Sequence, residues 1–188
     1  GSEMCIRDRD ELKRLEEKQI GISRLEQVRD IFLFCCLTGL AYVDVASLST
    51  ENIVEGKRGR QWLRKARNKT NNMCNIPLLR PALRILEKYA EYRAATGRLL
   101  PVPSNQKMNA YLKELATLCG VAKNLTTHCA RHTFATTVTL ANGASLENVS
   151  KMLGHSSVRM TQHYAKILNS SIERDMDKIE SELIGEDE

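Results

Sequence analysis

Helical start and stop signals dominate this chain, and one stretch, residues 59–77, departs from them. Ser23 followed by Glu26 has the spacing of a helical capping box, and Gly39 stands where a helix that begins there would end. Within residues 59–77 the pattern changes to that of a β-hairpin, with Asn71-Asn72 at the turn. The sequence therefore predicts an α+β fold that is mainly α-helical and carries a small antiparallel β-sheet.

Further helices are expected along the rest of the chain. These segments are residues 44–48, 81–90, 109–119, 133–140, 145–153 and 158–164. Pro81 suits the first turn of its helix, Asn142-Gly143 is a stop signal, and Ser145 is a helix N-cap. A final amphipathic helix is predicted from apolar residues that recur at three- to five-residue intervals, namely Ile167, Ile172, Met176, Ile179 and Leu183.

The formal net charge of +5 is unevenly distributed along the chain. From Glu173 onward there are eight acidic and two basic residues, so residues 1–172 carry a net charge of +11. A basic body with a separate acidic tail suits a polyanionic partner such as double-stranded DNA. Ordinary solubility charge is the alternative that composition alone leaves open.

The six cysteines do not have the spacing of a metal site. No signal peptide or membrane-spanning run is recognised in the sequence. We therefore expect free thiols in a reducing cytoplasm, with no metal, no cofactor and no membrane partner. The cysteines are Cys5, Cys35, Cys36, Cys74, Cys119 and Cys129.

The densest group of chemically active side chains lies between His128 and Tyr164. His128 and Arg131 are three residues apart and so share one side of a helical turn, and His155 precedes Tyr164 by nine residues. A phenol, two imidazoles and a permanently charged guanidinium are the groups that phosphoryl transfer onto tyrosine requires. Taken singly, such residues more often serve packing or the polar surface. The prediction of a site therefore depends on all four occurring together.

This segment closely resembles the tyrosine recombinases, or phage integrase family. The resemblance is carried by His128-Cys129-Ala130-Arg131-His132-Thr133, Leu153-Gly154-His155-Ser156-Ser157 and Thr161-Gln162-His163-Tyr164. It implies that Tyr164 attacks a DNA phosphodiester and becomes 3′-phosphotyrosyl, without ATP or metal. It further implies that Arg131 clamps the scissile phosphate while His128 and His155 bond its oxygens or move a proton. The pattern gives no catalytic role to His132 or His163, for which we expect packing or DNA-backbone contacts.

In this family a lysine on a β-hairpin protonates the departing 5′ oxygen. Lys69, eight residues before Pro77, has the hairpin position expected of that general acid, and Lys65 is the competing candidate. The surrounding basic residues are predicted to contact DNA phosphates, although a solvated basic edge strand has the same composition. These candidate DNA-binding residues are Lys57, Arg58, Arg60, Arg64 and Lys65.

One position departs from the family pattern. Residues 36–45 resemble the box that carries the first catalytic arginine, but Ala41 stands at that position. By resemblance, the integrases of some conjugative transposons and other mobile elements share this absence. Arg67 is the predicted replacement, because it lies two residues from Lys69 and alternate residues of a strand share a face.

Asp44 holds the family's acidic position. The resemblance implies a carboxylate that orients Arg131 or His128 without itself touching DNA. A cap at a helix N-terminus is the alternative role.

The resemblance covers residues 20–170, which we expect to form the catalytic domain of a longer integrase. Residues 1–19 are expected to be a tag remnant, suggested by Gly1-Ser2, followed by an N-terminal linker or helix. Residues 171–188 are expected to form a C-terminal helix and acidic tail that docks on a neighbouring protomer or packs on its own domain. The resemblance implies four copies on DNA, a free monomer, accessory DNA-bending proteins and a place at the bacterial nucleoid.

The leading function is therefore site-specific DNA recombination that integrates or excises a mobile element. The alternative from another class is a catalytically silent DNA-binding module of the same fold, which Ala41 favours. A third candidate is topoisomerase-like relaxation of DNA by the same chemistry without sequence-specific exchange. A covalent protein–DNA bond separates the silent module from the two enzymes.

Overall fold

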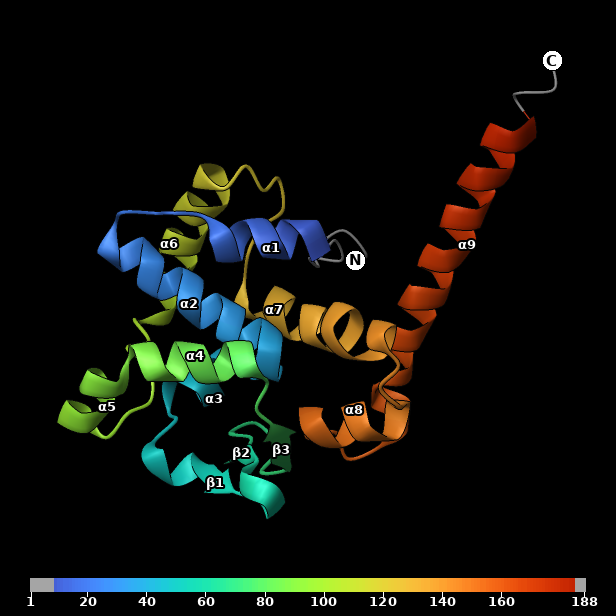
Figure 1. Cartoon of the computed structure of the whole chain (residues 1–188). Helices are drawn as coiled ribbons and strands as arrows, with labels where there is room; N and C mark the ends of the chain where they lie inside the picture. The colour runs from blue at the N-terminus through green and yellow to red at the C-terminus, as the bar shows by residue number, and fades with distance from the viewer. Residues whose placement is uncertain (1–8, 185–188) are drawn as a thin grey trace.

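The structure, a computed structural model, describes residues 9–184 and arranges its helices around a central α2, with a small sheet at one end (Figure 1). The expectations for Gly1-Ser2 and Cys5 lie outside the described residues. The α-helices are α1 (Arg9–Glu17), α2 (Ser23–Thr38), α3 (Tyr42–Ala46), α4 (Arg80–Lys88), α5 (Ala90–Thr96), α6 (Asn105–Leu118), α7 (Thr127–Thr133), α8 (Leu146–Leu153) and α9 (Gln162–Ile184). The shorter helical turns are η2 (Thr50–Asn52), η3 (Lys57–Gly59), η5 (Leu140–Asn142), η6 (Val158–Met160) and the π-helical η4 (Phe134–Thr139).

The hairpin predicted for residues 59–77 is present. β2 (Gln61–Ala66) pairs antiparallel with β3 (Met73–Pro77), and the buried Leu63 lies opposite the buried Ile76. The sequence pattern does not predict β1 (Ile53–Glu55), which pairs along the other edge of β2, because three residues are too few to show an alternation. The mainly helical fold with a small antiparallel sheet is confirmed, with strand order β1-β2-β3.

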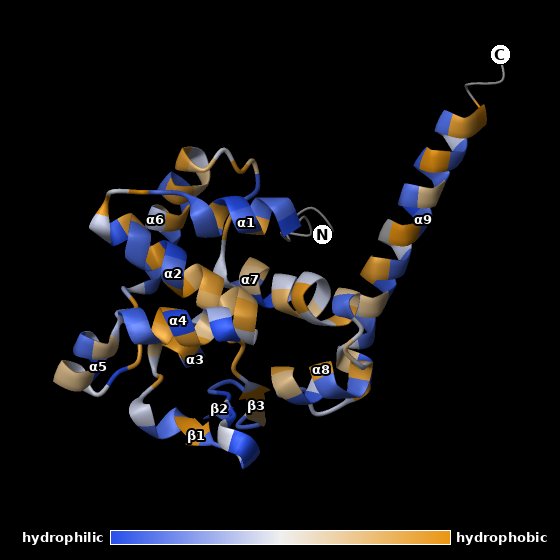
Figure 2. Cartoon of the chain, in the orientation of Figure 1, coloured by the Kyte–Doolittle hydropathy of each residue, from blue (hydrophilic) through white to orange (hydrophobic). Residues whose placement is uncertain are grey.

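α2 passes through the middle of the molecule and supplies much of its core. Figure 2 shows polar residues at its start and hydrophobic residues along its second half. Phe32, Phe34 and Cys35 are each 0% exposed. They are buried on all sides because α2 packs against α1, α4, α6 and α7. Removing each large apolar side chain from water stabilises the fold by roughly 1.5–3 kcal/mol.

The sequence predicted the C-terminal end of α2 correctly but not its N-terminal cap. The capping box predicted from Ser23 is wrong, because the N-cap is the apolar Ile22, which makes no side-chain cap bond. At the other end Gly39 is left-handed with φ of 76°, as predicted, and its N–H donates to the Cys35 carbonyl. A Cβ at Gly39 would lie 2.5 Å from Phe134, so both conformation and packing require glycine there.

Several predicted helices are present, and others are divided differently. The helices predicted near residues 44–48, 109–119 and 145–153 are α3, α6 and α8. The helix predicted for residues 81–90 is α4, which ends at Lys88 because Tyr89 leaves the helical conformation at φ −104° and ψ 24°; a separate helix, α5, follows from Ala90.

The chain after α7 also departs from a regular α-helix. The predicted helix 133–140 contains the π-helix η4, in which the Thr139 hydroxyl donates to the carbonyls of Phe134 and Ala135. Such hydroxyl bonds compete with the regular helical ladder. The stop at Gly143, with φ of 90°, and the cap at Ser145 are confirmed.

The short helix predicted for residues 158–164 is wrong. η6 ends at Met160, and α9 begins at Gln162 and runs to Ile184. Thr161 separates the two elements, because it follows the last residue of η6 and precedes the first residue of α9. Tyr164 therefore stands in the first turn of a long helix.

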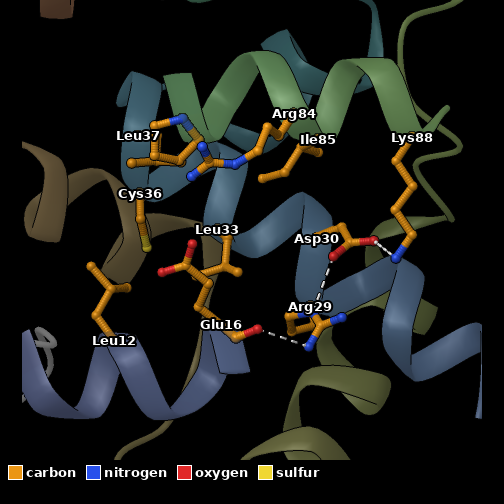
Figure 3. Close-up of a pocket in the computed structure, with 11 residues that line it drawn as sticks. Leu12, Glu16, Arg29, Asp30, Leu33, Cys36, Leu37, Arg84, Ile85 and Lys88 are labelled. Atoms are coloured by element: carbon orange, nitrogen blue, oxygen red, sulfur yellow. Dashed lines mark hydrogen bonds and ion pairs between the residues drawn. The ribbon is translucent and has the colours of Figure 1, made fainter. Parts of the chain in front are cut away.

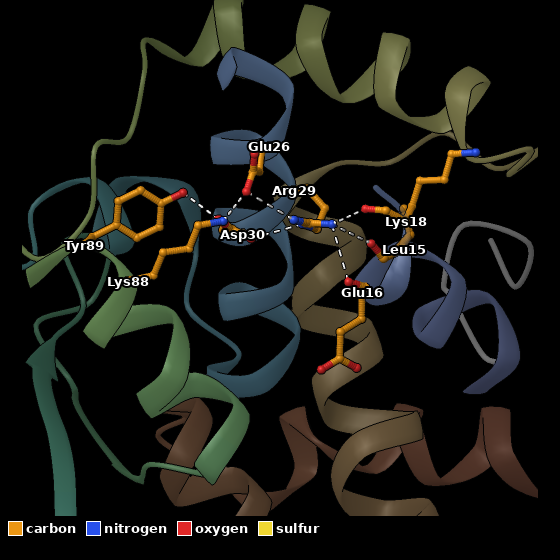
Figure 4. A network of polar contacts seen from close by, with 8 residues as sticks. All are labelled: Leu15, Glu16, Lys18, Glu26, Arg29, Asp30, Lys88 and Tyr89. Carbon is orange, nitrogen blue, oxygen red and sulfur yellow. Dashed lines mark hydrogen bonds and ion pairs between the residues drawn. The ribbon is translucent and has the colours of Figure 1, made fainter. Parts of the chain in front are cut away.

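α1 is held to the core by buried polar contacts centred on Arg29 (Figure 4). The guanidinium donates to three main-chain carbonyls that the end of α1 leaves without helical partners. Asp30 pairs with Arg29 and with Lys88 of α4, so one acidic group joins two helices. Residues 9–17 are therefore part of the packed domain. The three carbonyls belong to Leu15, Glu16 and Lys18.

A cavity of about 210 Å³ lies between α1, α2 and α4 (Figure 3). Leu12, Leu33 and Ile85 give it an apolar wall, and Glu16 and Arg84 add charged groups. None of the residues predicted to act on DNA lines this cavity. The candidate site lies elsewhere, where α2, α7, α8 and the hairpin meet.

α9 leaves the body of the molecule after its first turns and extends away from it (Figure 1). The apolar residues predicted on its final turns are exposed: Ile172 by 60%, Met176 by 59% and Leu183 by 63%. The alternative that this face packs on its own domain is therefore wrong. An apolar stripe of this kind on an extended helix is unusual for a surface in contact only with water.

Candidate active site

Arg131 lies where three helices converge. It belongs to α7, is only 6% exposed, and donates to the carbonyl of Gly39 at 2.6 Å and to that of Leu153 at 2.8 Å. These carbonyls end α2 and α8, where the backbone carries partial negative charge and lacks helical donors. The two bonds use two of the five N–H donors of the guanidinium. The position of Arg131 therefore depends on the ends of α2 and α8.

Arg67, directly after β2, brings a second guanidinium into the same region. The Arg67 side chain lies against Gly154, next to Leu153, whose carbonyl Arg131 binds. Burial, and then the positive charge of Arg67, lower the pKa of Arg131. Among the residues described, none accepts a hydrogen bond from the buried Nε of Arg67. Two guanidinium groups that share a buried region suit an anion with several oxygens, such as a phosphate.

Asp44 fixes the hairpin turn. It lies inside α3, whose N-cap is Ala41, so the alternative of a helix-capping role is wrong. Its Oδ1 accepts a 2.9 Å bond from the main-chain N–H of Asn68, and its Oδ2 lies 4.0 Å from the Nε of Arg67. The contacts of this buried carboxylate therefore reach the turn after β2, and its negative charge also acts on Arg131 of α7, whose pKa it raises against the effect of burial.

Lys69 lies in the turn between β2 and β3 and is exposed. β2 ends at Ala66, and the turn is closed by a 2.9 Å bond from the Arg67 N–H to the Asn72 carbonyl. Asn71 supplies the left-handed conformation, with φ of 59°, that the turn needs. Arg67 and Lys69 do not share a strand face as predicted, because β2 ends before either residue.

The other basic candidates surround the same sheet. Lys65 is half-buried in β2 opposite Cys74, so the competing general-acid candidate stands on the strand and not in the turn. Arg64 is exposed, and its Nε donates to the Asn75 side chain at 2.9 Å. The remaining exposed residues lie on η3 and at the start of β2, and they are Lys57, Arg58 and Arg60.

His155 follows α8 and is half-buried beside the two guanidinium groups. Its Nδ1 lies 2.6 Å from the hydroxyl of Thr161. Burial, followed by the charges of Arg131 and Arg67, lowers the pKa of His155 to about 4. The imidazole is therefore neutral near pH 7, and a bound anion that offsets the two cations would raise this pKa.

Tyr164 is 4% exposed and packs against two imidazole rings. Its ring centroid lies 3.8 Å from that of His163 and 5.1 Å from that of His132. The Tyr164 N–H donates to the Thr161 carbonyl at 3.1 Å, while the Thr161 hydroxyl contacts His155. One buried threonine therefore couples the positions of the phenol and of the second imidazole.

His128 lies on α7 one turn before Arg131. It is exposed, whereas Arg131 points into the core. Its Nε2 lies 2.9 Å from the Nε2 of His132, and the ring centroids are 4.4 Å apart. The structure thus brings Arg131, Arg67, His155 and Tyr164 together from α7, the turn after β2, the end of α8 and α9, and His132 contacts both the exposed His128 and the ring of Tyr164.

Three further residues shape the site without a predicted role. Thr161 stands in the Thr-x-x-Tyr pattern, but only the fold shows that it joins His155 to Tyr164. Gly154 has φ of 69°, and a Cβ there would lie 3.0 Å from Cδ of Arg67, so glycine makes room for the second guanidinium. Asn68 acts through its main-chain N–H, which no side-chain pattern reveals.

Residues 9–184 hold neither a metal-binding group of side chains nor a membrane-spanning helix. Within this range, no three His, Cys, Asp or Glu side chains are grouped so that they could hold a metal ion. Of the helices in the described part, none combines the length and apolarity needed to cross a bilayer. The described cysteines are thiols and not disulfides, and they are Cys35, Cys36, Cys74, Cys119 and Cys129.

Residues 8–170 match the family described as "Phage integrase family". This range covers most of the chain and contains every predicted site residue. Among curated proteins, the chain is similar to tyrosine recombinase XerD of Rhizobium meliloti (strain 1021), at 32% identity over 146 residues, which are 72% of this chain and 45% of that protein. It is similar to tyrosine recombinase XerD of Corynebacterium glutamicum at 32% over 136 residues, which are 71% of this chain and 43% of that protein. The chain therefore spans less than half the length of these curated relatives.

Solved structures share the fold at low sequence identity. The XerH site-specific recombinase bound to palindromic difH substrate, a post-cleavage complex, superposes with a TM-score of 0.69 and 14% identity over 87% of this chain and 49% of that one. The catalytic domain of bacteriophage HP1 integrase gives a TM-score of 0.60 and 19% identity over 91% of this chain and 95% of that one. These likenesses establish that the helices and the three-stranded sheet have the arrangement of this fold.

Proposed function

This chain belongs to the phage integrase family, and from that premise we propose that it cleaves and rejoins DNA as the catalytic domain of a site-specific recombinase. The family resemblance predicted from residues 128–164 is thereby confirmed. The observation that carries the proposed activity is the convergence of Arg131 and Arg67 beside His155 and Tyr164: Arg131 bonds the Leu153 carbonyl, Arg67 packs against Gly154, and Thr161 contacts both His155 and Tyr164. The resulting reaction would integrate or excise a mobile element.

The proposed chemistry is transesterification. The Tyr164 oxygen attacks the scissile phosphorus, a phosphotyrosyl bond to the 3′ end forms, and the bond to the 5′ oxygen breaks. The phenolic proton leaves to a base, and the departing 5′ oxygen takes a proton from a general acid. Since one phosphodiester replaces another, a 5′-hydroxyl of a second strand can reverse the step. Rejoining then needs neither ATP nor a metal.

Arg131 and Arg67 would hold the non-bridging phosphate oxygens. In this proposal Arg67 supplies the charge that Ala41 does not, and its buried Nε gains the acceptor that no described residue provides. His155, neutral near pH 7, would bond the same phosphate and share in proton transfer, and His128 would donate to it from α7.

Lys69 remains the proposed general acid. Its exposure in the β2–β3 turn lets it reach a duplex that lies outside the protein surface, and Asp44 holds the adjacent Asn68 in place. Lys65 is the second candidate, although its half-buried position on β2 gives it less reach. The exposed basic residues of η3 and β2 would contact neighbouring phosphates and are Lys57, Arg58, Arg60 and Arg64.

Partners follow from the same proposal. The substrate is double-stranded DNA, and residues 20–170, with α1 packed on them, are the catalytic unit. Residues 171–188 would place the exposed face of α9 on another copy within a tetramer on DNA, while the protein without DNA would be a monomer. Accessory DNA-bending proteins and the bacterial nucleoid are the proposed setting in the cytoplasm.

A catalytically silent DNA-binding module is the second candidate. Ala41 favours it, because loss of one charged contact with a developing phosphorane typically lowers a rate by ~10²–10³-fold. The grouping of Arg131, Arg67, His155 and Tyr164 weighs against it.

Covalent trapping tests the proposal. Wild-type protein and Tyr164→Phe are incubated with labelled, nicked suicide DNA from the ends of the element and denatured in SDS. A shifted band that is lost in Tyr164→Phe supports recombinase chemistry. If the wild type binds this DNA but gives no shifted band, the silent module is the better description.

A further inference from the structure

We propose that His132 is a positioning residue that fixes where His128 carries its proton and, through the same ring, links His128 to Tyr164. This inference rests on the proposed function, in which His128 donates to the scissile phosphate. The observation behind it is the approach of two ring nitrogens on α7, where Nε2 of His128 and Nε2 of His132 are 2.9 Å apart.

The spacing of these histidines makes the contact a property of the helix. Residues four apart lie on the same face, one turn above the other. The ring centroids of His128 and His132 are 4.4 Å apart, and the rings are inclined by 64°. With this inclination the two nitrogens meet at their edges, whereas parallel rings would stack.

A hydrogen bond between two imidazole nitrogens requires that one, and only one, of the two nitrogens carries a proton. One nitrogen must donate and the other must accept, so one ring carries its proton on Nε2 and the neutral partner carries its proton on Nδ1. We assign the donor to His132. His128 then accepts through Nε2 and is held as the Nδ1–H tautomer, which leaves Nδ1–H to donate to a phosphate oxygen. The reverse assignment would leave only an unprotonated nitrogen of His128 for that phosphate.

The same ring of His132 also touches the nucleophile. Its centroid lies 5.1 Å from that of Tyr164 with an interplanar angle of 81°, an edge-to-face contact. A shift of Tyr164 would therefore move the ring that orients His128. His163 provides a comparison, because it packs on Tyr164 at 3.8 Å and meets the His132 ring edge-on at 6.1 Å, but directs its Nδ1 to the Met160 carbonyl at 2.9 Å and not to His128.

The first test reads the tautomer directly. Long-range ¹H–¹⁵N correlation spectra of the ¹⁵N-labelled protein are recorded under alkaline conditions. We expect His128 to be protonated at Nδ1 and His132 at Nε2. In His132→Phe, which keeps a ring against Tyr164 but has no donor, His128 should become a mixture of tautomers. In His163→Phe the His128 tautomer should stay as in the wild type.

The second test measures the consequence for cleavage. The single-turnover rate of covalent complex formation should fall roughly 10–100-fold in His132→Phe, the usual range for the loss of an orienting hydrogen bond, with the DNA dissociation constant unchanged. His132→Gln, which retains an N–H donor, should recover part of the rate. The unfolding midpoint of each variant shows whether the fold is intact.

Two results would overturn the assignment: a wild-type His128 protonated at Nε2, or a His128 that keeps its Nδ1–H tautomer in His132→Phe. A lower unfolding midpoint in His132→Phe without any change of tautomer would likewise mean a packing role only. If the wild type forms no covalent complex, the proposed function fails, while the tautomer measurement still decides the role of His132.

Discussion

The Nε of Arg67 lies 4.0 Å from Oδ2 of Asp44, and it is a buried nitrogen that meets no hydrogen-bond acceptor in the described part of the chain. The pair is close enough for charge attraction and too far apart for a hydrogen bond. Asp44 meanwhile uses its other oxygen to hold the Asn68 N–H. The Asp44 carboxylate thus attracts the Arg67 guanidinium but does not accept a hydrogen bond from its Nε. A guanidinium with a donor still available suits a group that must bind an incoming anion.

Replacement of Arg67 should remove most of the cleavage activity. We expect Arg67→Ala to lower the rate of covalent complex formation by ~10²–10³-fold, because one charged contact with the phosphate oxygens is lost. Arg67→Lys should be intermediate, since it keeps the charge but not the planar fork. Arg84→Ala on α4 is the matched control, because it removes an exposed arginine away from the site. Wild-type rates in Arg67→Ala would refute the compensation for Ala41.

Arg131 should be as important for stability as for chemistry. In Arg131→Met the carbonyls of Gly39 and Leu153 lose charged donors at the ends of α2 and α8. Bonds of this type contribute about 1.5–3 kcal/mol each, so we expect unfolding in urea to reveal a loss of roughly 3 kcal/mol. Arg131→Lys should lose less. An unchanged unfolding free energy in Arg131→Met would show that these carbonyls find other partners.

The lowered pKa of His155 predicts a specific dependence of stability on pH. Its pKa is about 4 in the folded protein, below the ordinary value of 6.5, so between these values the unfolded chain binds a proton that the folded protein does not. The free energy of unfolding should therefore fall as the pH is lowered from about 6.5 to about 4, and this contribution should level off below that.

His155→Asn tests this dependence because it removes the titrating group. The fall in unfolding free energy between pH 6.5 and 4.5, measured in urea, should be smaller than in the wild type. Arg67→Ala should also reduce it, since the Arg67 cation is one cause of the shift. An identical pH dependence in His155→Asn and wild type would contradict the prediction.

Asp44 should control the order of the turn that carries Lys69. Asp44→Ala removes the acceptor of the Asn68 N–H, so hydrogen exchange at that amide should become roughly tenfold faster or more, as expected for loss of a bond to a charged group. Asp44→Asn retains one acceptor oxygen and should protect the amide partly. The cleavage rate should follow the same order. Equal exchange in all three proteins would mean that the turn is held by its own main-chain bonds.

Removal of the end of α9 should affect assembly and not folding. Ile172, Met176 and Leu183 are exposed, so deletion of residues 170–188 should change the unfolding free energy by less than about 0.5 kcal/mol. On DNA the truncated protein should form smaller complexes than the intact chain, as measured by native mass spectrometry. A tetramer of unchanged mass would rule out docking of this helix between copies.

Local residue chemistry determined much of this protein from the sequence alone. Gly39 and Gly143 mark helix ends because they tolerate a left-handed conformation, and the alternation around Leu63 indicates the hairpin. The spacing from His128 to Tyr164 was sufficient to predict the family, because the identities of the reactive groups are written directly in the chain. Ala41, the departure from the family pattern, is likewise written in the chain.

Only the tertiary structure decided how these groups meet. Arg67 lies in a turn directly after β2, where Asp44, more than twenty residues earlier in the chain, accepts a bond from the next main-chain N–H, and from there its charge acts on Arg131. Arg131 bonds the ends of α2 and α8, which are distant from it in the sequence. The course of α9, which begins before Tyr164 and carries an apolar face into solvent, likewise depends on how distant segments pack. Periodicity and spacing describe neighbours along the chain, whereas burial, electrostatic fields and main-chain partners arise only when those segments pack together.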